Sequence, residues 1–182
     1  QLVTMTQAKP VFGDEVSDTA ELARVLGAPA DAIASHPVPQ VVSTAMPQLM
    51  IPLGSREALA RMPSGGTGSD LMRFLRRYET DCAMCYVLDE SRSTAFCRMF
   101  APGLGVPEDP ATGSAAGALG AYLAHNGLLD VAGGKAAFTV QQGSEIGRPS
   151  TIAVDLHVGA TGPTVVRVGG TATRILEGEL AL

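Results

Sequence analysis

The amino-acid sequence predicts an α+β fold in which a curved, mixed or antiparallel sheet wraps around one buried central helix at about residues 114–125. The first observation is the order of the elements. About eight or nine short strands and four helices do not alternate regularly, which disfavours a doubly wound parallel sheet. The second observation is that segment 115–124 contains no charged residue. A helix that is apolar on every side is buried, and the glycines and alanines of this one allow strands to approach closely.

The composition agrees with a folded chain. It has 182 residues, of which 46% are apolar and 17% are charged. A disordered chain would contain fewer apolar and more charged residues. This length is enough for one ordinary domain or for two small lobes.

Three short helices are predicted in the first half of the chain. The first begins with a capping-box pattern, Asp18 followed by Glu21, and ends before Gly27. The second is expected at 56–62 and the third at 70–78, where apolar residues recur along one helical face. The opposite face of the third helix is interpreted as solvent-exposed and carries three arginines: Arg73, Arg76 and Arg77.

Strands are predicted on both sides of the central helix. Before it they are expected at 2–6, 41–45 and 49–53, and as a hairpin of 82–88 with 94–100. After it they are expected at 136–142, 152–157, 164–169, 172–176 and 179–182. The segment between the hairpin and the central helix is rich in glycine and proline, so a loop is predicted there.

The charge balance excludes two classes of partner. Thirteen Lys and Arg against eighteen Asp and Glu give a formal net charge of −5, and only two of the basic residues are lysines. Because nucleic acids and acidic membranes are bound by clustered basic residues, neither partner is expected. No apolar run reaches the roughly 20 residues of a membrane-spanning helix, and no signal-peptide pattern is recognised.

The three cysteines suggest neither a disulfide framework nor a metal site. Cys82, Cys85 and Cys97 are an odd number, which fits a reducing, cytoplasmic location. The pair Cys82 and Cys85 has C-x-x-C spacing, but it lies in a strand-like run where the two side chains point to opposite faces. No metal is expected, because a zinc site normally needs a second pair of ligands.

The candidate site is the segment that leads into the central helix. Glu108 and Asp109 precede a proline, and the small residues Thr112, Gly113 and Ser114 follow. The N-terminus of a helix presents free amides and the positive end of its dipole, so an anion can bind there. A substrate carboxylate is expected rather than a phosphate, since no Gly-x-x-x-x-Gly-Lys loop is present. Asp109 would then lie at the reacting end as a charged or proton-sharing group.

A structural interpretation of the same residues is equally compatible with their spacing. Ser114 would cap the helix, and Asp109 would accept hydrogen bonds from loop amides. A similar choice applies to Arg148, which either faces the binding cleft or belongs to a loop that holds the next strand. The spacing alone leaves both choices open.

Four segments of the chain carry a family resemblance. They are Glu108-Asp-Pro-Ala-Thr-Gly-Ser114, Gln142-Gly-Ser-Glu-Ile-Gly-Arg-Pro-Ser150, Arg98-Met-Phe-Ala-Pro, and the ending Val168-Gly-Gly followed by Glu177-Gly-Glu-Leu180. In order and spacing they resemble the PhzF (phenazine biosynthesis) family of isomerases, which are relatives of diaminopimelate epimerase. The resemblance covers most of the chain but only the C-terminal half of a family member.

The resemblance implies two similar lobes, each with a curved sheet around a central helix, and an active site in the cleft between them. Residues 1–165 would form the C-terminal-type lobe, and 166–182 would be final strands that return to the other lobe. The N-terminal lobe has no counterpart in this chain. The implied activity is a cofactor-independent proton transfer on a small carboxylic acid in a biosynthetic pathway, performed by a cytoplasmic homodimer.

The resemblance also implies roles for individual residues. Asp109 would be the catalytic residue, and Thr112, Gly113, Ser114 and Arg148 would bind the substrate. The general acid/base would come from the absent lobe. In the epimerase relatives a catalytic cysteine takes the position of Thr112, so a two-thiol mechanism is not supported here. The alternatives are a non-catalytic module that binds a small molecule or protein, and an amino-acid epimerase or dehydratase of the same superfamily.

Overall fold

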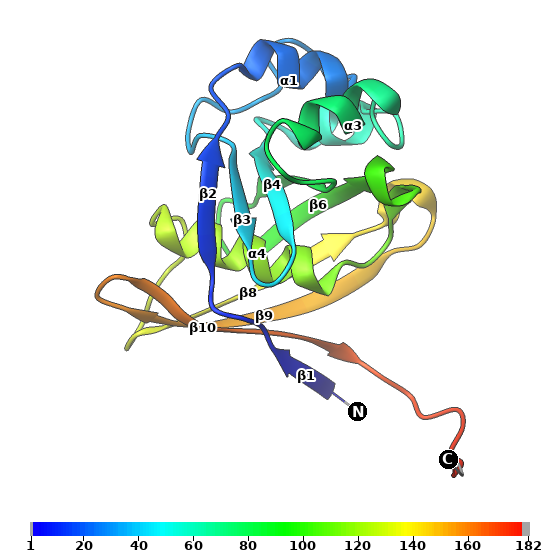
Figure 1. Ribbon diagram of the computed structural model, residues 1–182. Coiled ribbons are helices and arrows are strands. Elements are labelled where there is room, and N and C mark those ends of the chain that lie inside the picture. The colour runs from blue at the N-terminus through cyan, green and yellow to red at the C-terminus, as the bar shows by residue number, and fades with distance from the viewer. Residues whose placement is uncertain (1, 180–182) are drawn as a thin grey trace.

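A curled sheet of ten strands surrounds one helix, α4 (Gly113–His125), in the computed structural model, which describes residues 2–179 (Figure 1). The strands are β1 (Leu2–Thr6), β2 (Val11–Glu15), β3 (Gln40–Ser43), β4 (Pro47–Pro52), β5 (Ala83–Leu88), β6 (Thr94–Ala101), β7 (Val106–Asp109), β8 (Lys135–Gln142), β9 (Ser150–Gly159) and β10 (Gly162–Thr171). The other helices are α1 (Thr19–Leu26), α2 (Arg56–Arg61) and α3 (Ser69–Arg76). This architecture confirms the predicted α+β fold with a central helix.

The sheet is mixed. Its strand order is β1-β10-β9-β8-β6-β5-β4-β3-β2, and β7 pairs with β6 beside this path. β4 is parallel to β5 and β6 is parallel to β8, whereas the other pairs are antiparallel. The chain passes from β6 to β8 through α4, so the N-terminus of α4 lies near the C-terminal ends of these two strands. Ligands of open α/β sheets often bind at this end of the strands.

The sheet separates two hydrophobic cores, and successive residues of β5 alternate between them. Met84 and Tyr86 face α4, whereas Ala83 and Cys85 face the layer formed by α1, α2 and α3. Cys82 belongs to the α4 core. Cys82 and Cys85 therefore point to opposite faces, as predicted from the strand period.

Small residues allow α4 to lie inside the sheet. Nine of its thirteen residues are buried. A Cβ atom added to Gly117 would lie 3.2 Å from Cγ1 of Val168, and one added to Gly120 would lie 2.9 Å from Cγ1 of Val154. Glycine at these positions therefore sets the distance from α4 to β9 and β10. Neither α4 nor another helix within residues 2–179 has the length and apolarity needed to cross a membrane.

Capping residues set the boundaries of the first two helices. Oδ1 of Asp18 accepts a hydrogen bond of 2.9 Å from the amide of Glu21, and Gly27 ends α1 in a left-handed conformation with φ of 68°. Oγ of Ser55 accepts a hydrogen bond of 3.1 Å from the amide of Ala58 at the start of α2. Both helices are confirmed, and their capping residues could be recognised in the sequence.

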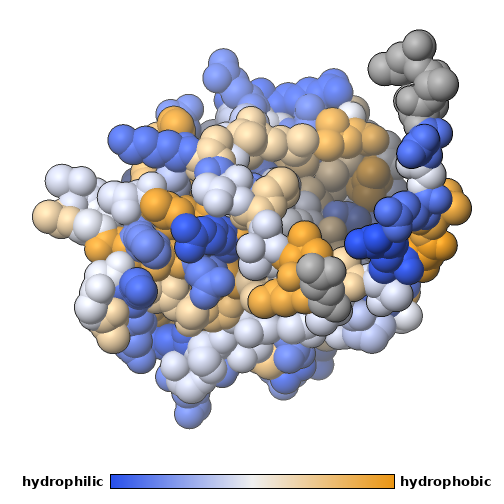
Figure 2. Space-filling model, turned by 90° about the horizontal axis from the view of Figure 1, so that it is seen from below, coloured by the Kyte–Doolittle hydropathy of each residue, from blue (hydrophilic) through white to orange (hydrophobic). Residues whose placement is uncertain are grey.

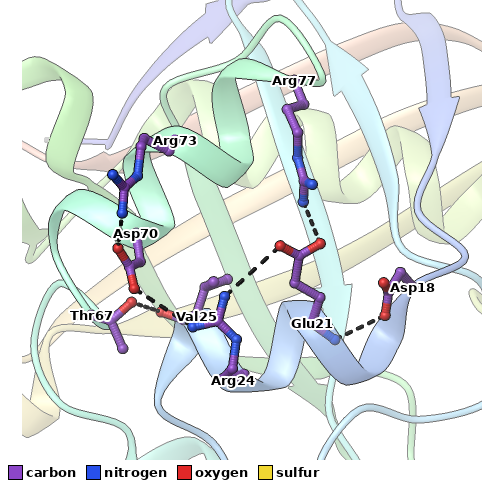
Figure 3. Close-up of polar contacts among 8 residues, drawn as sticks. All are labelled: Asp18, Glu21, Arg24, Val25, Thr67, Asp70, Arg73 and Arg77. Atoms are coloured by element: carbon purple, nitrogen blue, oxygen red, sulfur yellow. Dashed lines mark hydrogen bonds and ion pairs between the residues drawn. The ribbon is translucent and has the colours of Figure 1, made fainter.

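Ion pairs on the molecular surface join α1 to α3 (Figure 3). Arg77 donates to Glu21 at 2.6 Å. Arg24 lies 3.6 Å from Asp70, which also pairs with Arg73. These five side chains are between 31% and 73% exposed. Such exposed pairs contribute little to stability, and the arginine face of α3 is solvent-exposed, as predicted.

Three segments differ from the sequence predictions. β2 and β7 were not predicted, because their side chains are mostly exposed and show no apolar alternation. The predicted strand at 172–176 is wrong, since 172–179 has no regular secondary structure. The strand predicted at 179–182 lies, apart from its first residue, outside the described residues. β10 continues across residue 165, and the return of 166–182 to another lobe stays a prediction.

Candidate active site

The N-terminus of α4 presents free amide groups. Thr112 is the N-cap residue, and its side chain makes no capping hydrogen bond. The first amides of a helix have no acceptor within the helix, so those of Gly113 and Ser114 are available to a ligand. Ser114 is the second residue of the helix. The structural interpretation in which Ser114 caps the helix is therefore wrong.

Asp109 lies at the end of β7 beside this helix terminus. Its Oδ2 accepts a hydrogen bond of 2.5 Å from the hydroxyl of Thr112. Its Oδ1 has no hydrogen-bond donor among residues 2–179. The donor to Asp109 is thus a side-chain hydroxyl rather than the loop amides of the structural interpretation. The arrangement orients the carboxylate and leaves one of its oxygens for another molecule.

Gln142 holds the turn between Asp109 and Thr112. Its Nε2 donates to the carbonyl of Asp109 at 2.5 Å and to the hydroxyl of Thr112 at 3.0 Å, and its Oε1 accepts from the Thr112 amide at 3.3 Å. Ser150 adds a hydrogen bond of 2.6 Å to the carbonyl of Pro110. Both ends of the segment 142–150 therefore support the turn. Gln142 begins one of the segments that carry the family resemblance, but its spacing gave no sign of this supporting role.

Gly143 is required where this segment meets the turn. Its φ is +85°, and a Cβ atom there would lie 2.3 Å from the carbonyl oxygen of Arg148 and 2.8 Å from that of Pro110. The amide of Arg148 donates to the carbonyl of Gly143 at 2.8 Å and closes the loop. The Arg148 side chain is exposed and makes no hydrogen bond or ion pair with residues 2–179. Its contact with a substrate stays a prediction.

Glu108 and Asp109 are adjacent in sequence but have different environments. Glu108 accepts two hydrogen bonds from Arg98, of 2.8 and 2.6 Å, and the two side chains are 2% and 3% exposed. Burial alone would lower the pKa of Arg98, but its hydrogen bonds with Glu108 raise that pKa above the ordinary value. Glu108 therefore anchors β7, and the catalytic role of Asp109 stays a prediction.

Two buried polar residues contact Ser114: Thr44 in the turn between β3 and β4, and Gln48 near the start of β4. Nε2 of Gln48 donates to Oγ of Ser114 at 3.1 Å, and Oγ1 of Thr44 donates to its carbonyl at 3.4 Å. Oε1 of Gln48 is buried and has no partner within residues 2–179. A buried polar atom without a partner costs about 1–3 kcal/mol. Neither residue was singled out from the sequence, in which they precede Ser114 by 66 and 70 positions.

An open hollow of ≈ 630 Å³ lies beside the start of α4. Ala111 and Gly113 line it together with parts of β1, β9 and β10. Figure 2 shows the molecule from below, where the surface is hollowed and apolar residues surround the depression. On β1, which borders the hollow, Leu2 is 64% and Met5 is 61% exposed. The hollow is large enough for a small organic acid.

The three cysteines are free and buried. Burial raises the pKa of Cys85 to about 12 and that of Cys97 well above its ordinary value. A thiol with a raised pKa is a poor nucleophile and a poor metal ligand at neutral pH. Within residues 2–179, no three His, Cys, Asp or Glu side chains are grouped as metal ligands.

The chain is similar in sequence to proteins named as isomerases. It matches the PhzC-PhzF family, described as phenazine biosynthesis-like protein, over residues 1–178. It is 32% identical to an uncharacterized isomerase from Clostridium acetobutylicum over 187 aligned residues, which cover 99% of this chain and 60% of the relative. The chain thus spans about three fifths of that relative's length.

Solved structures show the same fold. A PhzF-family phenazine biosynthesis protein from Bacillus anthracis superposes with a TM-score of 0.79 at 24% identity, over 100% of this chain and 61% of that one. A predicted epimerase from Pseudomonas aeruginosa superposes with a TM-score of 0.68 at 34% identity, over 93% of this chain and 55% of that one. These superpositions confirm the diaminopimelate epimerase-like fold. The sequence match over residues 1–178 shows that the chain belongs to the phenazine biosynthesis-like (PhzC-PhzF) family.

Proposed function

We propose that the chain supplies one side of the active site of an isomerase, which moves a proton on a small carboxylic acid without a cofactor in a biosynthetic pathway. The observation that carries the proposal is the hydrogen bond from Thr112 to Asp109 beside the uncapped start of α4. If the start of α4 binds the substrate carboxylate, the oriented carboxylate of Asp109 would lie next to the carbon that carries it. The name of the C. acetobutylicum relative supports the same class of reaction.

The first turn of α4 is assigned to the substrate carboxylate. The amides of Gly113 and Ser114 and the hydroxyl of Ser114 would donate to it, where the helix dipole stabilises negative charge. Charge that develops on the carboxylate during proton removal would be stabilised by the same donors. The hydroxyl of Thr112 is already bonded to Asp109 and Gln142, so Thr112 acts by orienting Asp109. Arg148 would approach the substrate from its exposed loop.

The second acid or base is assigned to a segment outside the described residues. An isomerisation needs one group that removes a proton and one that returns it. The chain covers 60% of the C. acetobutylicum relative, which leaves 40% of that relative's length for another lobe. We assign the hollow beside α4 as the face that such a lobe closes. The working protein is proposed to be a cytoplasmic homodimer, in keeping with its acidic composition and free cysteines.

The test is deuterium incorporation at carbon. The purified protein is incubated in deuterated water with a panel of small unsaturated and amino carboxylic acids, and carbon-bound deuterium is measured by NMR. We expect exchange into at least one acid, and we expect Asp109→Asn to slow it by about 10²–10⁴-fold because proton transfer loses its carboxylate. Asp155→Asn is the matched control, since Asp155 is exposed on β9. Exchange that Asp109→Asn leaves unchanged would contradict the assigned role.

A non-catalytic binding module is the second candidate. It is favoured by the observation that Glu108 is paired with Arg98 and that residues 110–129 contain no further Asp or Glu, so this segment offers no second carboxylate beside Asp109. A binding module would hold the same carboxylic acids but incorporate no deuterium in any of them. An amino-acid epimerase is the third candidate, and it would convert one enantiomer into the other. A chiral separation of the incubated acids distinguishes it from the proposed isomerase.

A further inference from the structure

Gln48 is a wholly buried polar residue to which the proposed reaction assigns no role. Its side chain is 0% exposed, and the strand period turns it toward α4 together with Met50. Its Nε2 donates to Ser114, while its Oε1 has no partner within residues 2–179. A buried amide that leaves one atom unpaired is a poor stabiliser, and methionine would fill a similar volume without that penalty. Packing therefore does not account for an amide at this position.

The hydrogen bonds around Ser114 leave its hydroxyl proton unused. A serine hydroxyl has one proton to donate and two lone pairs to accept with. The amide of Gln48 occupies one lone pair. Helical serines commonly donate to the carbonyl one turn earlier, but that carbonyl belongs to Pro110 and accepts from Ser150 at 2.6 Å instead. No acceptor for the Ser114 proton occurs in the described part of the chain.

The position of Ser114 is also fixed through its backbone. Thr44 is 1% exposed and donates to the carbonyl of Ser114 at 3.4 Å. Thr44 lies in the turn that joins β3 to β4, and Gln48 is the second residue of β4. The start of α4 is therefore held by the sheet at both a main-chain and a side-chain atom.

We propose that Gln48 is a positioning residue, which keeps the Ser114 hydroxyl as a hydrogen-bond donor to the substrate carboxylate by donating to Ser114 Oγ. This inference rests on the proposed function and deepens it. If the amide were reversed, Oε1 would take the Ser114 proton, and the hydroxyl would present only lone pairs to the anion. An anion at the positive end of α4 favours the orientation in which Gln48 donates.

The first test is a formate titration of the isotopically labelled chain, followed by NMR at the amides of Gly113 and Ser114. We expect Gln48→Met to weaken formate binding by about fivefold, as for one lost hydrogen bond. Gln40→Met is the matched control, because Nε2 of Gln40 donates at 3.1 Å to the carbonyl of Gly13 and not to Ser114. In a chain that already carries Ser114→Ala, Gln48→Met should cause no further loss, because the group it positions is gone.

The second test uses a charge that responds to pH. In Gln48→Glu the introduced carboxyl donates to Ser114 only while it is protonated, and burial raises the pKa of such a group. Formate affinity of this variant should therefore fall as the pH rises from 5 to 8, more steeply than in the unchanged chain. An ionised carboxylate beside the anion would also repel formate, so the titration is repeated in a chain that carries both Gln48→Glu and Ser114→Ala, where only this repulsion remains. The positioning role predicts a steeper fall in affinity with Ser114 present, and equal pH profiles in the two backgrounds would contradict it.

The outcomes separate this inference from the function on which it rests. Absence of formate-dependent shifts at Gly113 and Ser114 in the unchanged chain would overturn both. Formate binding that Gln48→Met and Gln48→Glu leave unaltered would overturn the role of Gln48 alone. Equal losses in Gln48→Met and Gln40→Met would also overturn it, since the effect would then not depend on Ser114.

Discussion

At the scale of single residues, Arg98 and Glu108 illustrate how burial determines what a charged pair contributes. Both side chains are almost completely removed from solvent, and Arg98 also donates to the carbonyls of Leu59 at 3.0 Å and Met62 at 2.6 Å. Desolvation opposes both charges, and their mutual hydrogen bonds offset that cost. The pair therefore adds little over an apolar pair, but each charge depends on the other.

Removal of one partner should be far more costly than removal of both. We expect Arg98→Met to lower the free energy of unfolding by about 3–5 kcal/mol, because Glu108 keeps a buried charge without a partner. The double variant Arg98→Met with Glu108→Leu should recover most of that loss. Urea unfolding followed by circular dichroism measures both effects. A double variant no more stable than Arg98→Met would show that the loss does not come from the unpaired charge of Glu108.

At the scale of elements, α4 depends on the absence of side chains at particular positions. Alanine favours a helix over glycine by about 1 kcal/mol, so propensity alone predicts that Gly120→Ala is stabilising. The added Cβ would lie 2.9 Å from Val154 and 3.2 Å from Phe138, and neither neighbour has room to move within the packed core.

We therefore expect Gly120→Ala to lower the free energy of unfolding by about 1–3 kcal/mol, as for other overpacked cores. Gly54→Ala is the control, because an added Cβ there meets no atom closer than 3.7 Å. Thermal and urea unfolding of the two variants give the comparison. Stabilisation by Gly120→Ala would mean that propensity outweighs packing at this position.

The elements that the sequence predicted correctly are those whose own residues determine their secondary structure, whereas the missed ones depend on neighbouring strands. The uncharged segment and the capping residues identified α4 and α1 directly. β2 and β7 are held by main-chain hydrogen bonds to neighbouring strands while their side chains stay mostly exposed. Residues 172–176 show the opposite: their sequence favours a strand, but they form none. Ile175 and Leu176 are 94% and 85% exposed, so no neighbouring element of residues 2–179 covers them. A strand requires a partner, which local sequence does not reveal.

At the scale of the whole molecule, buried thiols should lower the free energy of unfolding as the pH rises above 9. The pKa of Cys85 is raised to about 12 and that of Cys97 also lies well above the ordinary value of 9.0, because burial opposes the thiolate. Burial raises the pKa of Tyr86 and Tyr122 as well. Above pH 9 the unfolded chain releases protons that the folded chain keeps, so stability falls as the pH rises.

We expect the free energy of unfolding to be about 2–4 kcal/mol lower at pH 10.5 than at pH 8 from Cys85 and Cys97 alone. The double variant Cys85→Ala with Cys97→Ala should be less stable at both pH values but should lose less between them. Urea unfolding at the two pH values measures the difference. An equal loss in the variant and the unchanged chain would assign the pH dependence to other groups.

The candidate site combines residues that are close together in the sequence with residues that only the folded sheet brings together. Asp109, Thr112, Gly113 and Ser114 lie in one short segment, so the sequence could propose them together, although their spacing alone left a structural interpretation open. Gln48 is far away in sequence and reaches Ser114 only because the order of the sheet places the start of β4 beside the start of α4. Strand order is a property of the complete sheet, and no local pattern in the sequence encodes it.

The apolar surface of α4 also has a consequence for the moment at which the site forms during synthesis. A helix of thirteen residues that includes three glycines is unstable alone, and it packs against Val166 and Val168 of β10. These valines are translated more than forty residues after Gly117. While the chain is still on the ribosome, the proposed anion site cannot be complete until β10 has emerged, so a ligand of that site could not stabilise the nascent protein before then.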